Sequence, residues 1–181
     1  AILLDGVDIR QLSIDDLRQS IVVVPQDPVC LAGTIRHNIS LFRNDLSEDQ
    51  IRQAADLSNA AKFIDQLPGG YQFKVQSGGA NLSQGQRQLL ALARALAHSP
   101  NAVLVLDEAT SSIDSATEAL IQEALARILK SRTSVVIAHR LSTIRSADRI
   151  VVMEKGEIVE EGNHQTLLTK DGYYAKLHQH L

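Results

Sequence analysis

The chain has 181 residues, of which 44% are hydrophobic and 3% aromatic, with a formal net charge of −3 at pH 7 and one cysteine. Lys and Arg are dispersed and aromatic residues are scarce, so we expect no nucleic-acid partner. No apolar run approaches the roughly 20 residues that cross a bilayer, and the single Cys30 predicts a reducing, cytosolic setting.

The first part of the chain predicts short strands followed by a helical region. Asp5-Gly6 between two apolar runs indicates a β-hairpin, and Ser13 is typical of a helix N-cap. The expected elements are strands at 2–4, 7–9 and 21–24, a short helix after Ser13, and helices within 34–66, one capped by Ser47 and another at 60–66.

The rest of the chain alternates between helices and strands, as in a mostly parallel sheet. Ser83 and Gln86 form a Ser-x-x-Gln capping box, and apolar residues follow at helical spacing. The expected elements are helix 83–97, strand 102–107, helix 116–130, strand 133–138, a short helix near 142–146, strand 149–154, a hairpin turn at 155–156 and a helical tail over 164–181.

Two sequence runs point to phosphate chemistry. Residues 81–88 read NLSQGQRQ and start a helix, whose exposed N–H groups bind anions, and Gly85 lets a phosphate approach the backbone. Residues 103–110 read VLVLDEAT, which predicts a parallel strand buried on both faces. Asp107 and Glu108 then stand at its carboxyl end, where α/β sheets bind ligands.

These runs resemble motifs of ATP-binding-cassette (ABC) ATPases. Residues 82–86 (LSQGQ) resemble the signature motif, and residues 103–108 resemble the Walker B strand with the catalytic glutamate. The Q-loop, the D-loop and the strand of the switch histidine are matched by 22–26, 111–114 and 135–139. One such motif alone is weak evidence. Five in the family's order extend the resemblance over nearly the whole chain.

The resemblance implies an α/β fold. We expect a P-loop-NTPase-like ABC ATPase core with a mostly parallel sheet, short antiparallel strands and an inserted α-helical subdomain. Residues 1–181 would form a single, partial ABC ATPase domain, with the helical subdomain, including the signature motif, at approximately 34–97.

One motif of the family is missing from the sequence. It contains no G-x-x-x-x-G-K-[ST], and residues 1–6 resemble the stretch that follows the Walker A helix. We therefore expect an N-terminally truncated cassette without the Walker A strand and helix. Apolar faces of the neighbouring strands should then be open to water, which would leave the 181-residue chain poorly stable or oligomeric, and inactive by itself.

The resemblance assigns four residues to hydrolysis. A carboxylate at a sheet edge can hold Mg²⁺, and an adjacent one can polarise water. Asp107 would bind Mg²⁺, Glu108 would act on the attacking water, Gln26 would ligate Mg²⁺ and water, and His139 would contact the γ-phosphate and orient Glu108. Judged by the residues alone, Gln26 also fits a solvated loop amide and His139 a structural residue. The other five histidines fit surface positions.

The resemblance also implies a shared ATP site, because two cassettes of this family bind ATP between them, head to tail. Ser83, Gly85 and Gln86 would contact the nucleotide held by a second ABC ATPase domain. Asp114 and Ser111 of the D-loop would lie across the same interface.

Residues 33–39 and 67–71 resemble exporter-type cassettes, in which a transmembrane domain is fused to the ATPase domain. The implied protein is an exporter ATPase at the cytoplasmic face of a membrane, with ATP, Mg²⁺, a second ATPase domain and the transmembrane domain. A second hypothesis stays open: a non-hydrolysing, truncated cassette that lends its signature face to a complete partner. A soluble ABC ATPase acting on nucleic acid is disfavoured by the charge and by these segments.

Overall fold

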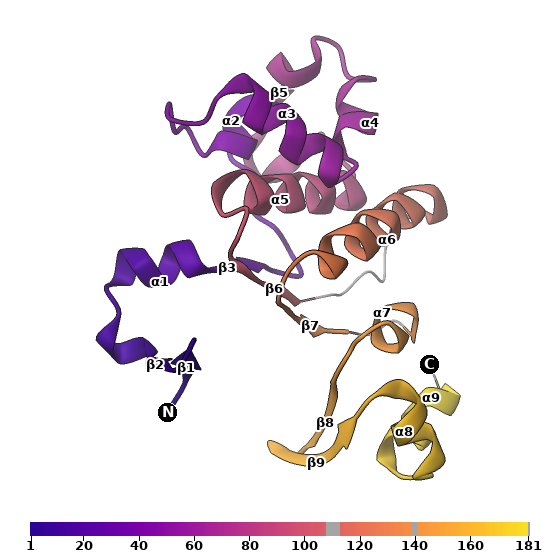
Figure 1. Ribbon diagram of the computed structural model, residues 1–181. Helices are drawn as coiled ribbons and strands as arrows, with labels where there is room; N and C mark the ends of the chain where they lie inside the picture. Colours follow the sequence, from indigo (N-terminus) through magenta and orange to yellow (C-terminus); the bar gives the residue numbers. More distant parts are fainter. Residues whose placement is uncertain (108–112, 139–140, 181) are drawn as a thin grey trace. The chain divides into compact units, whose positions relative to one another are not determined.

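The structure, a computed structural model, describes residues 1–107, 113–138 and 141–180. By their internal contacts the residues form two compact units, Ala1–Val136 and Ile137–Leu181. Helices and strands follow one another along the chain as Figure 1 shows. Within the described ranges, no helix has the length and apolar character needed to span a bilayer.

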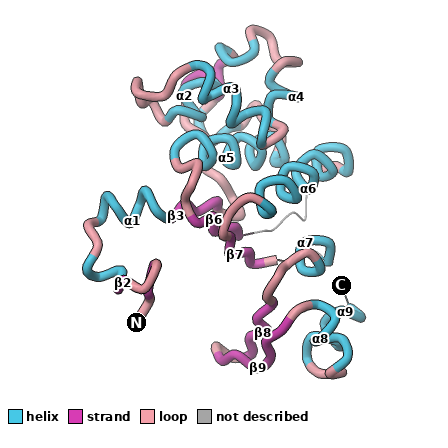
Figure 2. Tube along the Cα trace, viewed as in Figure 1, coloured by secondary structure: helices cyan, strands magenta, loops and turns pink. Residues whose placement is uncertain are grey.

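The first unit is built on a sheet in the order β3-β6-β7, shown in Figure 2. β3 (Ile21–Val24) and β6 (Val103–Asp107) are parallel, with Val24 opposite Leu106. β7 (Ser134–Ile137) is the third strand. These strands confirm the expected ones to within one residue at each end. The α/β fold class with a parallel sheet is therefore confirmed.

Only one face of this sheet is covered in the described residues. Leu104 and Leu106 are buried in the main core, whereas Val103 and Val105 are half-buried. The prediction that residues 103–106 are buried on both faces is therefore wrong, because side chains alternate across a strand and helices cover one side. On the open side Val23 is 59% exposed and Val135 55% exposed. Open apolar strand faces were expected from the sequence, and this expectation is confirmed.

A helical region lies between β3 and β6 in the sequence, and its helices α2, α3 and α4 contact α5. A short antiparallel pair, missed from the sequence, brackets α2 to α4: β4 (Gly33–Thr34) and β5 (Lys74–Val75). The helices are α2 (Ile35–Ser40), α3 (Glu48–Leu57), α4 (Ala60–Ile64) and α5 (Gln84–His98).

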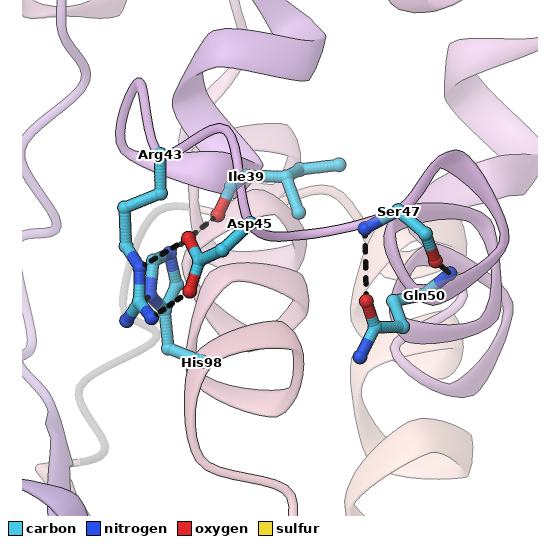
Figure 3. A network of polar contacts seen from close by, with 6 residues as sticks. All are labelled: Ile39, Arg43, Asp45, Ser47, Gln50 and His98. Atoms are coloured by element: carbon cyan, nitrogen blue, oxygen red, sulfur yellow. Dashed lines mark hydrogen bonds and ion pairs between the residues drawn. The ribbon is translucent and has the colours of Figure 1, made fainter.

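Side-chain caps begin most of these helices. Ser47 and Gln50 form the predicted capping box of α3: the Ser47 N–H donates to Gln50 Oε1 at 2.8 Å, and the Gln50 N–H donates to Ser47 Oγ at 3.2 Å (Figure 3). Such a cap is worth about 1 kcal/mol. The apolar faces of the helices then form one core, which includes Ile35, Ile39, Ile51, Ile64, Leu89 and Leu90, all fully buried.

The first unit also contains an N-terminal hairpin, a 3-10 helix that follows it, and the helices α1 and α6. β1 (Leu3–Leu4) and β2 (Val7–Asp8) pair around Asp5-Gly6, as predicted. A 3-10 helix (Ile9–Gln11) leads to α1 (Ile14–Ser20), whose N-cap is the predicted Ser13. The long α6 (Ser115–Lys130) contacts α5 and α3.

The second unit has its own small core. The hairpin of β8 (Ile150–Glu154) and β9 (Glu157–Gly162) turns at residues 155–156, as predicted. The expected helical tail is two helices, α8 (His164–Thr169) and α9 (Tyr173–His180), and α7 (Leu141–Arg145) precedes the hairpin. The core consists of Ile150, Val152, Leu167 and Tyr174.

Candidate functional site

Gln26 and Asp107 follow two strands that lie side by side. Because Val24 of β3 pairs with Leu106 of β6, Pro25 is level with Asp107 and Gln26 comes one residue later. Gln26 is exposed and Asp107 is half-buried. The parallel register therefore brings both side chains to the carboxyl edge of the sheet, which is where such sheets bind ligands.

A small cavity opens beside Asp107. Its volume is about 10 Å³, on the order of one water molecule. Its polar lining residues are Asp107 and Gln88 of α5, and its apolar ones are Val24, Leu92, Leu106, Ile121 and Leu125. Gln88 is 7% exposed. Sequence reasoning missed Gln88, although a polar residue four positions before Leu92, on the apolar face of a helix, was a usable signal.

The start of α5 is held by the predicted capping box. The Gln86 N–H donates to Ser83 Oγ at 3.2 Å, and the Ser83 N–H donates to Gln86 Oε1 at 2.9 Å. Ser83 is exposed. The cap uses the Ser83 oxygen as an acceptor, which leaves the hydroxyl hydrogen able to donate to an anion.

The start of α6 lies against the start of α5. A Cβ placed on Gly85 would overlap with Thr117 Cγ2 and would lie 3.0 Å from Ile113 Cγ2. Asp114 is the N-cap of α6 and accepts a hydrogen bond from the Thr117 N–H at 2.9 Å. This N–H lowers the pKa of the exposed Asp114 carboxyl. Two helix starts are thus adjacent, and they carry Ser83, Gly85, Gln86 and Asp114.

Three of the predicted functional residues, Glu108, Ser111 and His139, lie outside the described residues, and their roles stay predictions. In the described part of the chain, no group of three or more His, Cys, Asp or Glu side chains could hold a metal ion. The Asp107 carboxylate and the Gln26 amide carbonyl are nevertheless oxygen donors, the type that Mg²⁺ prefers.

The histidines taken as surface residues also make contacts with other residues. His37, His98, His164 and His178 are half-buried, so part of each side chain is still exposed. Figure 3 shows His98 beside Ile39 and Arg43: its Nε2 lies 3.1 Å from the Ile39 carbonyl oxygen. The His164 Nδ1 lies 2.7 Å from the Tyr174 hydroxyl.

Comparisons with known proteins identify the family of this chain. The family profile described as ABC transporter matches residues 1–111, so the chain belongs to the ABC transporter family. An uncharacterised ABC transporter ATP-binding protein of Bacillus subtilis, YfiC, is 48% identical over 98% of this chain and 29% of its own. An ATP-dependent lipid A-core flippase of Syntrophus aciditrophicus is 52% identical over 98% of this chain and 30% of its own.

A solved structure gives the same result for the fold. A bacterial Atm1-family ABC exporter with ATP bound matches 98% of this chain and 31% of its own, with a TM-score of 0.87 and 39% identity. The chain therefore spans about 30% of the length of the relatives that it matches.

Proposed function

We propose that this chain is part of the ATP-hydrolysing domain of an ABC exporter, which couples ATP hydrolysis to movement of a substrate across a membrane. The observation that carries the proposal is the parallel register of β3 and β6, because it brings Gln26 and Asp107 to one sheet edge. Membership of the ABC transporter family supports it.

The site fits Mg²⁺ and ATP by its donor set. Asp107 and Gln26 would hold Mg²⁺ through oxygen atoms; when bound, the ion neutralises charge on the phosphates. Ser83 would donate its hydroxyl hydrogen to the γ-phosphate of ATP bound to a second ATPase domain, and the N–H groups at the start of α5 would act likewise. Glu108 would take the proton of the attacking water, and His139 would orient Glu108.

Two partners complete the proposal. A second ATPase domain would face Ser83 and Asp114 in a head-to-tail dimer, and a transmembrane domain would place this chain at the cytoplasmic face of the membrane. Leu41 and Phe42, at the end of α2, support contact with such a domain. They are 41% and 50% exposed, and both have left-handed backbone conformations (φ 50° and 61°). Neighbouring exposed apolar side chains are suited to contact with another protein surface.

The test is Glu108→Gln in the full-length protein, reconstituted in lipid vesicles. Turnover of ATP should fall roughly a hundredfold or more, because the amide takes up no proton from water, while ATP binding and ATP-dependent association of the ATPase domains should persist. Glu157→Gln is the matched control, because Glu157 is exposed on β9 and remote in sequence from every motif. Unchanged hydrolysis in Glu108→Gln would overturn the role of Glu108. Absence of hydrolysis by the unaltered protein would overturn the proposed function.

A further inference from the structure

We propose that Arg94 of α5 is a positioning residue for Gln26, acting through the loop that follows β3 (residues 25–31, here the Gln26 loop). The proposal rests on the proposed function, in which Gln26 ligates Mg²⁺ and water. Arg94 lies in the second half of α5, the helix whose N-cap is Ser83. It thereby links the two parts of the candidate site.

Among the described residues, the Arg94 guanidinium donates three hydrogen bonds, each to an uncharged oxygen. Nη1 donates to the Val29 carbonyl at 2.9 Å, within the Gln26 loop. Nε donates to the Asn38 carbonyl at 2.8 Å, and Nη2 donates to Asn38 Oδ1 at 3.2 Å. Burial lowers the pKa of Arg94, although arginine stays charged at physiological pH. Burying part of a charged guanidinium raises the free energy of the folded state unless its N–H groups form hydrogen bonds such as these.

Asn38 of α2 holds the same loop from another side. It is fully buried, and its Nδ2 donates to the Leu31 carbonyl at 2.8 Å and to the Thr34 carbonyl at 3.1 Å. Its Oδ1 accepts from the Leu31 N–H at 2.8 Å. Each polar atom of the Asn38 amide group is therefore bonded to the Gln26 loop, to Arg94 or to its own helix start.

A third contact joins the Gln26 loop to the segment that precedes the signature motif. The Gly78 N–H donates to the Cys30 carbonyl at 3.1 Å. Residues 29–31 are thus bonded to α5, α2 and the segment before α5. The position of residues 29–31 is therefore determined by the helical region and not by the sheet.

The other end of the Gln26 loop is fixed to the sheet, because β3 pairs with β6. Only residues 25–28 connect the two attachments, and they read Pro-Gln-Asp-Pro. Each proline fixes its own φ near −65°, so this connection is short and stiff. A shift of residues 29–31 relative to β3 must therefore move Gln26. Loss of the Arg94 bonds would loosen one of the two attachments and would let Gln26 leave its position at the carboxyl edge of the sheet.

The experiment is a double-mutant cycle in the full-length protein, with Arg94→Ala, Gln26→Ala and both together. Arg94→Ala should lower kcat roughly tenfold or more, raise the Mg²⁺ concentration for half-maximal activity, and change the KM for ATP less than about threefold. In a protein that already carries Gln26→Ala, adding Arg94→Ala should alter kcat less than about twofold, because the residue through which Arg94 acts is gone. Arg94→Lys should lose activity too, since an ammonium group does not replace the planar fork.

Arg127→Ala is the matched control. Arg127 Nη2 also donates to a backbone carbonyl, that of Leu57, and to Asn59 Oδ1, but these partners lie at the α3–α4 turn. Its kcat should stay within about twofold of the unaltered protein at a temperature where both are folded. A similar loss of kcat in both arginine variants would show that Arg94 acts through stability alone, and would overturn the proposal.

Hydrogen exchange of the full-length protein supplies a readout that needs no hydrolysis. Arg94→Lys is the milder change if Arg94→Ala fails to fold. It should speed exchange of the Leu31 and Gly78 amides, which are hydrogen-bonded at this segment, roughly tenfold, while the core of α5 keeps its protection. Unchanged exchange there, or additive losses of kcat in the cycle, would overturn the role of Arg94. If Arg94→Lys speeds exchange but the unaltered protein hydrolyses no ATP, the proposed function fails, and the positioning role falls with it.

Discussion

Gly85 on α5 lies against Thr117 on α6, so closely that any side chain at position 85 would overlap with Thr117 Cγ2. Asp114 caps the same turn of α6 through the Thr117 N–H. The glycine therefore has a packing role in addition to any contact with phosphate. It allows the first turns of α5 and α6 to lie side by side.

We expect Gly85→Ala to destabilise the protein by about 1–3 kcal/mol, the usual cost of overpacking, although alanine favours helix more than glycine does. Thr117→Ala in the same protein should recover part of the loss, because it removes the overlapping Cγ2. Thermal unfolding of the two single variants and the double variant measures the coupling. Strictly additive shifts would contradict direct contact between positions 85 and 117.

Asn59 is expected to be sensitive to substitution because it combines a left-handed backbone (φ 61°) with two side-chain bonds. Its Nδ2 donates to the Leu120 carbonyl at 2.8 Å, and its Oδ1 accepts from Arg127 at 2.7 Å. Asn59→Ala loses both bonds and keeps the unfavourable φ, at a cost of about 2–4 kcal/mol. Asn59→Gly also loses both bonds but removes the backbone strain. Its thermal midpoint should therefore lie between those of Asn59→Ala and the unaltered protein. An equal or lower midpoint for Asn59→Gly would show that backbone strain is unimportant there.

His98 should make stability depend on pH. Arg43 Nη1 lies 3.3 Å from His98 Nδ1 and can only donate, and the Ile39 carbonyl beside Nε2 can only accept, so the ring is neutral with its hydrogen on Nε2. Burial lowers the pKa of His98, and the positive charges of Arg43 and Arg94 lower it further. The hydrogen bond to Ile39 acts in the opposite direction but does not cancel these effects. In the unfolded chain the ring takes up a proton near pH 6.5. The unfolded state therefore binds more protons just below that pH, and stability is lost as pH falls from about 6.5 through the lower folded-state pKa.

The measurement is thermal unfolding between about pH 7.5 and 5.5 for the unaltered protein and His98→Gln. Because other groups titrate in both proteins, the informative quantity is the difference between the two curves. The unaltered protein should lose more stability on acidification. Parallel curves would show that His98 does not contribute.

The open face of the sheet should promote association of the 181-residue chain. Val23 and Val135 stand on this face, and exposed apolar patches are contact surfaces. The double change Val23→Thr with Val135→Thr keeps β-branched side chains and should shift the chain toward monomer in size-exclusion chromatography with light scattering, without loss of helical circular dichroism. Val152→Thr is the matched control, because Val152 is buried in the second core and should lower stability instead. No change in mass would exclude this face from self-association.

The sequence by itself determined the elements and their family. The Ser83 capping box, the strand that ends at Asp107 and each single motif are local patterns, which depend on residues a few positions apart. They were enough to predict the α/β class and the helix starts. The roles of Glu108 and His139, and the extents 1–181 and 34–97, stay predictions.

Only the tertiary structure decided which segments meet. The overlap at Gly85 depends on Thr117, 32 positions away in the sequence, and the contact of Arg94 with Val29 spans 65 positions. Local periodicity carries no information about such pairs, because burial and hydrogen bonding arise when distant segments pack. For the same reason the apolar run 103–106, taken by itself, gave the wrong prediction of burial on both faces: such a run indicates a strand, but neighbouring elements determine which of its faces they cover.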